Sequence, residues 1–228
     1  LSPSVAVVDL FHDVPSYNAH AGAHILDALT QTLPSGSVLL CVVDPGVGSE
    51  RAAVVMEVQG RYFIGPDNGL LSVVAARAST CRVWRIDWRP EQLSESFHGR
   101  DVFAPVAARL ATGGLPEGWL SDSELSVVFD SADLPRILYI DHFGNCITNI
   151  GQADIDALSP SADEPICVRA GGGPLGTLVG HFDDVPPGDA GAIVGSAGYV
   201  ELFCNQGNLA HQRSLAPGDP VMLEAGER

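Results

Sequence analysis

Residues 38–51 read Val-Leu-Leu-Cys-Val-Val-Asp-Pro-Gly-Val-Gly-Ser-Glu-Arg and decide the fold class. Residues 38–43 are a continuous apolar run, which is typical of a strand buried on both faces of a sheet. The run ends at Asp44 in a Pro/Gly turn, where glycines let the backbone approach a ligand closely. A carboxylate at the end of a buried strand needs a partner such as Arg51. The stretch therefore predicts either a binding site or an ordinary turn closed by an ion pair.

Strand and helix patterns alternate on both sides of this stretch as far as Leu120. Apolar runs at 5–10 and 53–58 predict further strands, and helical spacing of apolar residues predicts helices over 21–33, 68–76 and 102–110. Pro34-Ser35-Gly36 ends the first helix and Gly113-Gly114 ends the last. We expect an α/β N-terminal domain over residues 1–120, with a mostly parallel sheet flanked by helices.

The pattern changes beyond Gly118 to short apolar runs separated by glycine and proline, at 125–129, 136–140, 166–169, 175–179 and 199–203. This spacing is typical of an antiparallel sandwich or barrel. We expect a linker over residues 121–132 and an all-β, barrel-like C-terminal domain over residues 133–228. Gly171-Gly172-Gly173 precedes Pro174 instead of a helix-opening Lys-Ser or Lys-Thr, which predicts a hairpin turn and not a phosphate loop.

Charge and composition exclude several classes of partner. The net charge is −16, from 28 acidic and 12 basic residues, which argues against a nucleic acid or an anionic membrane. No apolar run reaches the ~20 residues that span a bilayer, and residues 1–4 do not resemble a signal peptide, so we expect a cytoplasmic protein. The five cysteines form no C-x-x-C pair and the seven histidines no H-E-x-x-H motif. We expect free thiols and no metal.

Four segments together resemble one family, the S-adenosylmethionine (SAM) hydrolases or SAM hydroxide adenosyltransferases, relatives of fluorinases and chlorinases. They are Val43–Gly48 with Arg51, Gly65–Leu71, Phe97–Asp101, and Asp141–Asn145 with Thr148-Asn149. A fifth, Asn205–Asn208 after Gly195–Tyr199, is similar to the family's adenine-side loop. The resemblance implies an α/β domain followed by a β-barrel, a homotrimer with sites at subunit interfaces, and SAM as substrate, with no cofactor.

The resemblance also implies the catalytic set. Asp44, Arg51 and His98 match the family's Asp–Arg–His residues, which position and activate water for attack on the 5′ carbon of SAM. The residue types suit these roles, because a carboxylate accepts a hydrogen bond from water, arginine fixes it with two bonds, and histidine holds or relays a proton near neutral pH. By its spacing alone, His98 is also compatible with a plain helix-entry residue beside Gly99 and Asp101.

Substrate contacts follow from the same resemblance. The resemblance implies that Asp141 anchors the methionine amino group and that Ser196 binds the amino-acid portion. Halogenating relatives carry arginine at the position of Ala197, so another donor is expected to bind the substrate carboxylate here. Asn205 and Gln206 suit the adenine edge, and Tyr17 suits the nucleoside, although a half-buried loop aromatic explains Tyr17 equally well. The remaining matched positions are Asp67, Asn68, Phe97, Gly99, Phe143, Asn145 and Tyr199. The first two of these also read as an N-cap and a turn.

Two alternatives remain open beside SAM hydrolysis. In the halogenating relatives, a tyrosine and a serine occupy the positions that match Asp44 and Gly99. A carboxylate at Asp44 repels halide, whereas it accepts a hydrogen bond from water. A chlorinase-like enzyme is therefore the weaker choice. A non-catalytic adenosine or SAM binding protein is the other, because Leu1 to Asp9 matches the family's second strand, so the first strand and its ribose-binding aspartate are expected to be missing.

Overall fold

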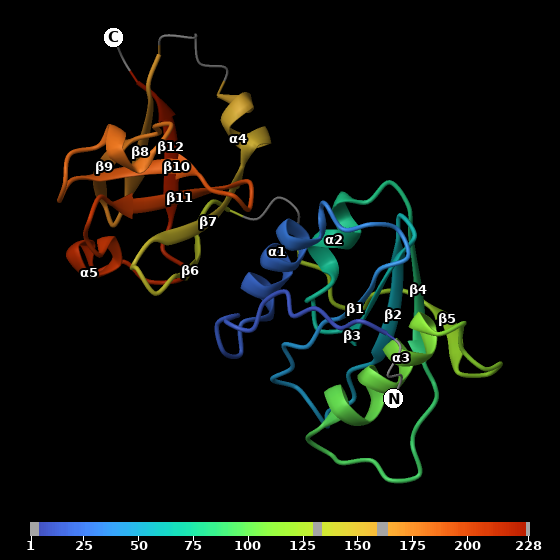
Figure 1. The fold of residues 1–228 in the computed structure, drawn as a ribbon. Helices are drawn as coiled ribbons and strands as arrows, with labels where there is room; N and C mark the ends of the chain where they lie inside the picture. The colour runs from blue at the N-terminus through green and yellow to red at the C-terminus, as the bar shows by residue number, and fades with distance from the viewer. Residues whose placement is uncertain (1–4, 130–133, 159–163, 227–228) are drawn as a thin grey trace. The chain divides into compact units, whose positions relative to one another are not determined.

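The chain folds as two compact units, Leu1–Ser131 and Ala132–Arg228. The computed structural model describes residues 5–129, 134–158 and 164–226. Two hydrophobic clusters lie in each unit, so each has its own core. Figure 1 shows the first unit in blue to green and the second in yellow to red.

A five-stranded mixed sheet forms the centre of the first unit. Its strands are β1 (Val38–Leu40), β2 (Ala53–Val58), β3 (Arg61–Pro66), β4 (Cys81–Ile86) and β5 (Leu120–Ser123). They lie in the order β1-β3-β2-β4-β5. β5 overlaps the start of the segment that we expected as the linker, residues 121–132, and it pairs with β4.

The prediction of a mostly parallel sheet was wrong. Only β1 and β3 run parallel, and the other three pairings are antiparallel. The reason lies at Gln59 and Gly60, which have φ of 52° and 75° and connect β2 directly to β3. Two residues with positive φ make a tight hairpin, and a hairpin forces its strands to be antiparallel.

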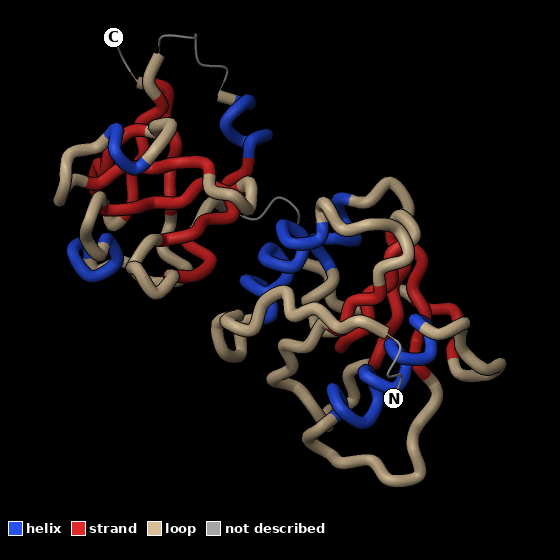
Figure 2. The backbone as a smooth tube through the Cα atoms, viewed as in Figure 1, coloured by secondary structure: helices blue, strands red, loops and turns tan. Residues whose placement is uncertain are grey.

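Helices cover both faces of this sheet (Figure 2). Alternate residues of β2 point to opposite faces, so Val54 and Met56 belong to one hydrophobic cluster and Val55 to the other. The first face packs against α1 (Ala19–Thr30) and α2 (Ser72–Arg77). The second packs against a π-helical turn, η1 (Gly99–Phe103), which continues into α3 (Ala104–Ala111).

Two strand predictions in the first unit were wrong, one in the existence of the strand and one in its extent. Residues 5–10 form no strand, and Val7 and Val8 are 86% and 76% exposed, because no described strand pairs with this segment. The strand predicted over 38–43 ends at Leu40 and lies at the edge of the sheet. Leu40 and Val42 are therefore half-exposed. The strand predicted over 53–58 is confirmed as β2, which is buried on both faces.

Two antiparallel sheets make up the second unit. One has the order β10 (Ala190–Val194), β11 (Tyr199–Cys204), β7 (Cys146–Gly151), β6 (Ile137–Ile140). The other has the order β12 (Val221–Ala225), β8 (Ile166–Ala170), β9 (Gly173–Thr177). Short helices accompany them: α4 (Gln152–Ala157), η2 (Phe182–Asp184) and α5 (Leu209–Arg213). A single large cluster of buried residues from both sheets forms the core.

The all-β prediction holds for the sheets, but the described residues form no closed barrel. Isolated bridges, Arg136 to Pro220 and Leu178 to Ala192, join the two sheets where a barrel would have full ladders. Among the strand predictions, 175–179 is shifted to β9, and 125–129 is no strand because its backbone bonds to a side chain of the first unit instead. The glycine-rich hairpin between β8 and β9 is confirmed.

Candidate active site

Asp44 and Arg51 stand at the two ends of the turn that connects β1 to β2. The turn is closed by backbone hydrogen bonds from Val47 to Asp44 (3.3 Å) and from Ser49 to Gly46 (3.0 Å). Gly48 has φ of +83°, and a Cβ there would lie 2.7 Å from the backbone carbonyl oxygen of Glu95. Only glycine fits such a position, so the Gly-Val-Gly sequence shapes the turn that brings the carboxylate and the guanidinium together.

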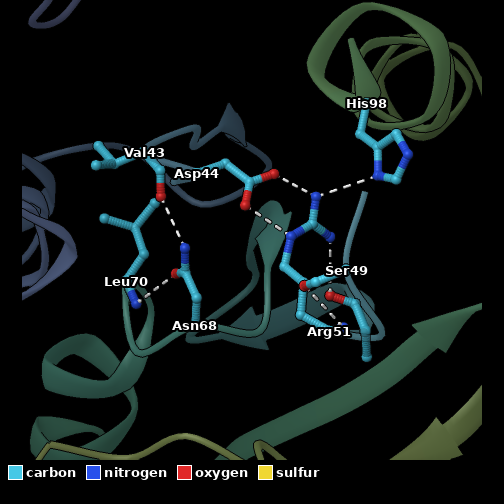
Figure 3. Close-up of polar contacts among 8 residues, drawn as sticks. Val43, Asp44, Ser49, Arg51, Asn68, Leu70 and His98 are labelled. Atoms are coloured by element: carbon cyan, nitrogen blue, oxygen red, sulfur yellow. Dashed lines mark hydrogen bonds and ion pairs between the residues drawn. The ribbon is translucent and has the colours of Figure 1, made fainter. Parts of the chain in front are cut away.

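The Asp44–Arg51 pair is two-pronged and nearly buried. Arg51 Nε donates to Asp44 Oδ1 at 2.7 Å, and Arg51 Nη2 donates to Asp44 Oδ2 (Figure 3). The two side chains are 8% and 5% exposed. Arg51 Nη1 also donates to the Ala52 carbonyl (3.3 Å), and the guanidinium lies 5.4 Å from the centre of the Phe103 ring. These contacts fix both side chains in one geometry.

His98 completes the cluster from a second segment, at the entry to the π-helical turn. Its Nδ1 lies 3.1 Å from Arg51 Nη2. Because a guanidinium only donates, Nδ1 accepts in this contact, and the neutral ring carries its hydrogen on Nε2. Burial and the Arg51 charge lower the pKa of His98 below its ordinary 6.5, against a smaller opposing effect of Asp44. The imidazole is therefore neutral at pH 7.

Asp67 and Asn68 support the backbone around this cluster. Asn68 Nδ2 donates to the Val43 carbonyl at 2.8 Å, which holds the residue before Asp44 (Figure 3). Asp67 is buried, and its carboxylate accepts hydrogen bonds from the Ser126 backbone N–H (2.9 Å) and hydroxyl (2.6 Å). The bonds of Asp67 go to the 125–129 segment and those of Asn68 to the turn, so both side chains stabilise the fold of this unit.

Three further predicted residues lie at or near the surface of the first unit. Tyr17 is 83% exposed with φ of +65°, just before Asn18, whose side chain caps α1. Phe97 is 56% exposed, and the Arg100 guanidinium lies 4.9 Å from its ring centre. Gly99 follows His98 and faces Val42, with space for a Cβ at 3.6 Å. Within the described residues, no hydrogen bond or ion pair joins any of these three to the Asp44 or Arg51 side chain.

The second unit carries an open hollow of about 580 Å³. Five of its lining residues were predicted from the sequence: Asp141, Phe143, Asn145, Asn205 and Gln206. Gly207 and Asn208 belong to the Asn205–Asn208 segment noted in the sequence, and the remaining three were not predicted: Phe182, Glu201 and Cys204. The hollow therefore gathers residues from the turn after β6, from η2, from β11 and from the segment that follows β11.

Asp141 organises the turn at the wall of this hollow. Its Oδ1 accepts from the backbone N–H groups of Phe143 and Asn145, each at 2.9 Å, and its Oδ2 accepts from Asn145 Nδ2 at 3.1 Å. Asn205 is buried and donates through Nδ2 to the Val185 carbonyl at 2.6 Å. Neighbouring Gln206 has φ of +57° and is exposed. Asn205 thus anchors the loop and Gln206 projects from it.

Ser196 and Tyr199 are not among the residues that line the hollow. Ser196 is exposed in the 195–198 turn, and Tyr199 is 4% exposed at the start of β11. Glu201, which sequence reasoning missed, does line it. Its signal was a single charged residue inside the apolar run of β11, where alternation places it on the face away from the core residues Val200 and Leu202.

Within the described ranges, no group of three or more His, Cys, Asp or Glu side chains is placed to hold a metal ion. None of the helices formed by those residues is both long and apolar enough to cross a membrane. The cysteines are free, three of them buried.

The chain folds as two compact units, and the first of them holds the Asp44–Arg51–His98 cluster. Sequence profiles of the SAM hydroxide adenosyltransferase family match the chain, the N-terminal domain over residues 1–119 and the C-terminal domain over residues 135–222. The chain belongs to this family, and the family prediction made from the sequence motifs is confirmed.

Individual relatives agree with this assignment. An (R)-S-adenosyl-L-methionine hydrolase from Salinispora arenicola is 35% identical over 99% of this chain and 89% of its own length. A fluorinase from Nocardia brasiliensis is more distant, at 25% identity over 98% and 88%. A crystal structure of an uncharacterized conserved protein from Thermotoga maritima has a TM-score of 0.86 and 33% identity, and the match covers 97% of this chain and 90% of that one.

Proposed function

We propose that this protein hydrolyses SAM to adenosine and L-methionine, by attack of water on the 5′ carbon. The observation that carries the proposal is the Asp44–Arg51–His98 cluster, in which a nearly buried ion pair from one turn meets a histidine from a second segment, in a chain of this family. The hydrolase from Salinispora arenicola, which is similar over nearly the whole chain, supports it.

The chemistry needs a positioned water and a proton acceptor. Attack forms the C5′–O bond and breaks the C5′–S bond, and the electron pair of the broken bond stays on sulfur and neutralises the sulfonium. Methionine leaves as a neutral thioether, so no general acid is required. The attacking water loses one proton, which a nearby base must accept.

Asp44 is the group that we assign to the water. Arg51 occupies one acceptor position on each carboxylate oxygen, which leaves the second lone pair of each oxygen for a hydrogen bond from water. Because Arg51 is itself held by Ala52, the direction of these lone pairs is fixed before substrate binds. Such a fixed geometry is what an in-line displacement requires.

His98 acts first on Arg51 in this arrangement. Its Nδ1 accepts from the guanidinium, so only Nε2–H remains to contact substrate or water, and it does so as a donor. A direct proton relay through Nε2 would need the other tautomer, which places two hydrogens between Nδ1 and Nη2. We therefore assign the first proton transfer to Asp44 and a positioning role to His98.

The charge of Asp44 also selects the nucleophile. A carboxylate attracts the hydrogens of water and repels chloride or fluoride, so hydrolysis is favoured over the halogen transfer that a fluorinase name implies for the more distant relative. Gly99 offers no hydroxyl that could hold a halide in its place.

For the substrate, we propose that Asp141 binds the methionine amino group, with Phe143, Asn145, Asn205 and Gln206 around the rest of the ligand. These residues line one hollow, which supports a shared ligand. Tyr17, Phe97 and Gly99 are proposed nucleoside contacts. Ser196 and Tyr199 stay proposed contacts at the rim, on the resemblance alone.

The domain boundaries, the assembly and the location are proposals of the same kind. We propose an N-terminal domain to residue 120, a linker over 121–132 and a C-terminal domain from residue 133. We propose a homotrimer in which one subunit's cluster faces a neighbour's hollow. A cytoplasmic location suits the free cysteine thiols, which persist in a reducing compartment.

Product analysis after incubation with SAM tests the function. Chromatography should show adenosine and methionine in equal amounts, at the same rate with and without chloride. Formation of a halogenated nucleoside would show that the protein transfers halide to the 5′ carbon, and would refute hydrolysis as its function. SAM binding by calorimetry without any product would leave a binding protein as the function.

A further inference from the structure

Two carboxylates face the hollow of the second unit, and only one of them was predicted. Asp141 follows β6, and Glu201 lies in β11 opposite Ile147 of β7. Glu201 reaches over the start of the 195–198 turn, because a Cβ on Gly195 would lie 2.8 Å from Glu201 Oε2. The carboxylate therefore stands between this turn and the Asp141–Asn145 turn.

The position of Glu201 is electrostatically unfavourable for the protein alone. Burial raises the pKa of Glu201 above its ordinary 4.5, the Asp141 charge adds to the rise, and a hydrogen bond from Asn145 offsets part of it. Burial and the same two carboxylates also raise the pKa of Tyr139 above 10. A cation bound in the hollow would relieve this repulsion.

No basic side chain that lines the hollow relieves the repulsion between Asp141 and Glu201. None of the ten residues found to line it, all in the described chain, is Lys, Arg or His. Ala197, in the exposed 195–198 turn beside it, carries no charge. The hollow thus offers two anionic groups to a ligand and no basic partner for a ligand carboxylate.

Asp141 has acceptor capacity left for such a cation. Its Oδ1 receives two backbone N–H bonds, which use both lone pairs, whereas Oδ2 receives one bond from Asn145. One lone pair on Oδ2 remains, together with the Glu201 carboxylate, and an ammonium group has three hydrogens to share between them.

We propose that the ammonium of the substrate's aminoalkyl chain binds between Asp141 and Glu201, and that the hollow does not require the substrate carboxylate. Adenosyl sulfonium compounds whose chain ends in an ammonium alone are then substrates of the same hydrolysis. Glu201 is a specificity-determining residue in this arrangement. The inference rests on the proposed function for its site and deepens it by naming the substrate class.

Two SAM analogues test charge selection. Decarboxylated SAM keeps the ammonium and lacks the carboxylate, and we expect its kcat/KM to lie within about tenfold of that of SAM. The deaminated analogue keeps the carboxylate and lacks the ammonium, and it should lose about 10- to 100-fold, as expected for a missing charged hydrogen bond. A decarboxylated substrate that is more than tenfold poorer than SAM, or a deaminated one that is as good, would overturn the proposal.

A matched pair of variants tests Glu201 itself. Glu201→Gln should raise KM for SAM about tenfold with kcat nearly unchanged, whereas Glu224→Gln, an exposed strand glutamate, should change neither. Removing the strained charge should also raise the Tm of Glu201→Gln at pH 7. An unchanged KM, or a KM rise accompanied by a lower Tm, would make Glu201 a structural residue and overturn its assignment.

The same experiments separate failure of this inference from failure of the proposed function. If the wild-type protein hydrolyses neither SAM nor the decarboxylated compound, hydrolysis is wrong. Calorimetric Kd values for the two compounds then still decide charge selection: a ratio within tenfold supports it, and a preference for SAM beyond tenfold refutes it.

Discussion

Asp44→Asn is the sharpest test of the cluster, because it changes one charge and almost no volume. The asparagine oxygen can still accept one bond from Arg51, but its NH2 group meets the other guanidinium N–H as donor against donor. Arg51 is 8% exposed, so its charge stays in the protein without a full partner. Removing one member of such a buried pair costs about 3–5 kcal/mol, and the retained bond places the expected loss near the lower figure.

A loss of about 3 kcal/mol leaves a typical domain folded, since domain stabilities are about 5–15 kcal/mol. The fall in kcat should be much larger than the small increase in the unfolded fraction of the protein can explain. Removal of the proton acceptor should lower kcat by about 10²–10⁴-fold, whereas KM for SAM should change little because Asp44 acts on the water.

The assay is product formation under saturating SAM, with urea denaturation of the same preparation. Asp27→Asn is the matched control: Asp27 is also a nearly buried carboxylate paired with an arginine, Arg77, but it lies on α1 outside the cluster. Its stability should fall and its kcat should not. If folded Asp44→Asn hydrolyses SAM at the wild-type rate, Asp44 has no part in the reaction and the proposed mechanism is wrong.

Three further results are expected. Asp44→Asn and Asp141→Asn should each lower kcat/KM for SAM strongly, and subunits mixed after denaturation and refolding should regain the wild-type kcat/KM at about a quarter of the sites if a trimer joins one subunit's cluster to another's hollow; no recovery contradicts that assembly. Because the pKa of His98 is lowered, kcat/KM should be flat above pH 6.5 and should fall at lower pH as Nδ1 is protonated. If kcat/KM of His98→Asn falls at low pH in the same way, the fall belongs to another group. Gly144→Ala should lower the free energy of unfolding, measured by urea denaturation, by about 2 kcal/mol or more, because φ is +89° and the new Cβ would displace the Asn208 side chain that caps α5. An equal loss for Gly99→Ala, where a Cβ has space, would refute this steric argument.

The helices of the first unit were predictable because their signals are local. α1 and α3 appear at the expected places, since apolar spacing and helix-ending residues act within a few turns. The sheet direction was missed because β3 was not recognised: residues 61–66 contain a Gly-Pro pair that was assigned to a site motif. The two-residue turn at Gln59-Gly60 is the signal that would have found the hairpin.

The site was predictable in parts for the same reason. Asp44 and Arg51 are seven residues apart, so the turn that joins them is visible in the sequence. His98 lies 47 residues beyond Arg51, and only family resemblance connected it with the pair. Glu201 was missed because its meaning depends on the sheet: a charged residue in a strand is unremarkable until β7 and the Asp141 turn place a second carboxylate beside the same hollow.

The Asp44–Arg51 pair and Glu201 are charged side chains that are largely removed from water, and the stability of the fold does not explain why they are there. A buried ion pair such as Asp44–Arg51 contributes little net stability after desolvation, and apolar residues of similar volume often serve a fold as well or better. Glu201 is less favourable still, because burial and Asp141 both oppose its charge. A chain that keeps such groups departs from the consistency between sequence and fold that holds elsewhere in both cores. The departures occur where water would be positioned and where a cation would bind, so the cost to the fold is understandable as a requirement of the reaction.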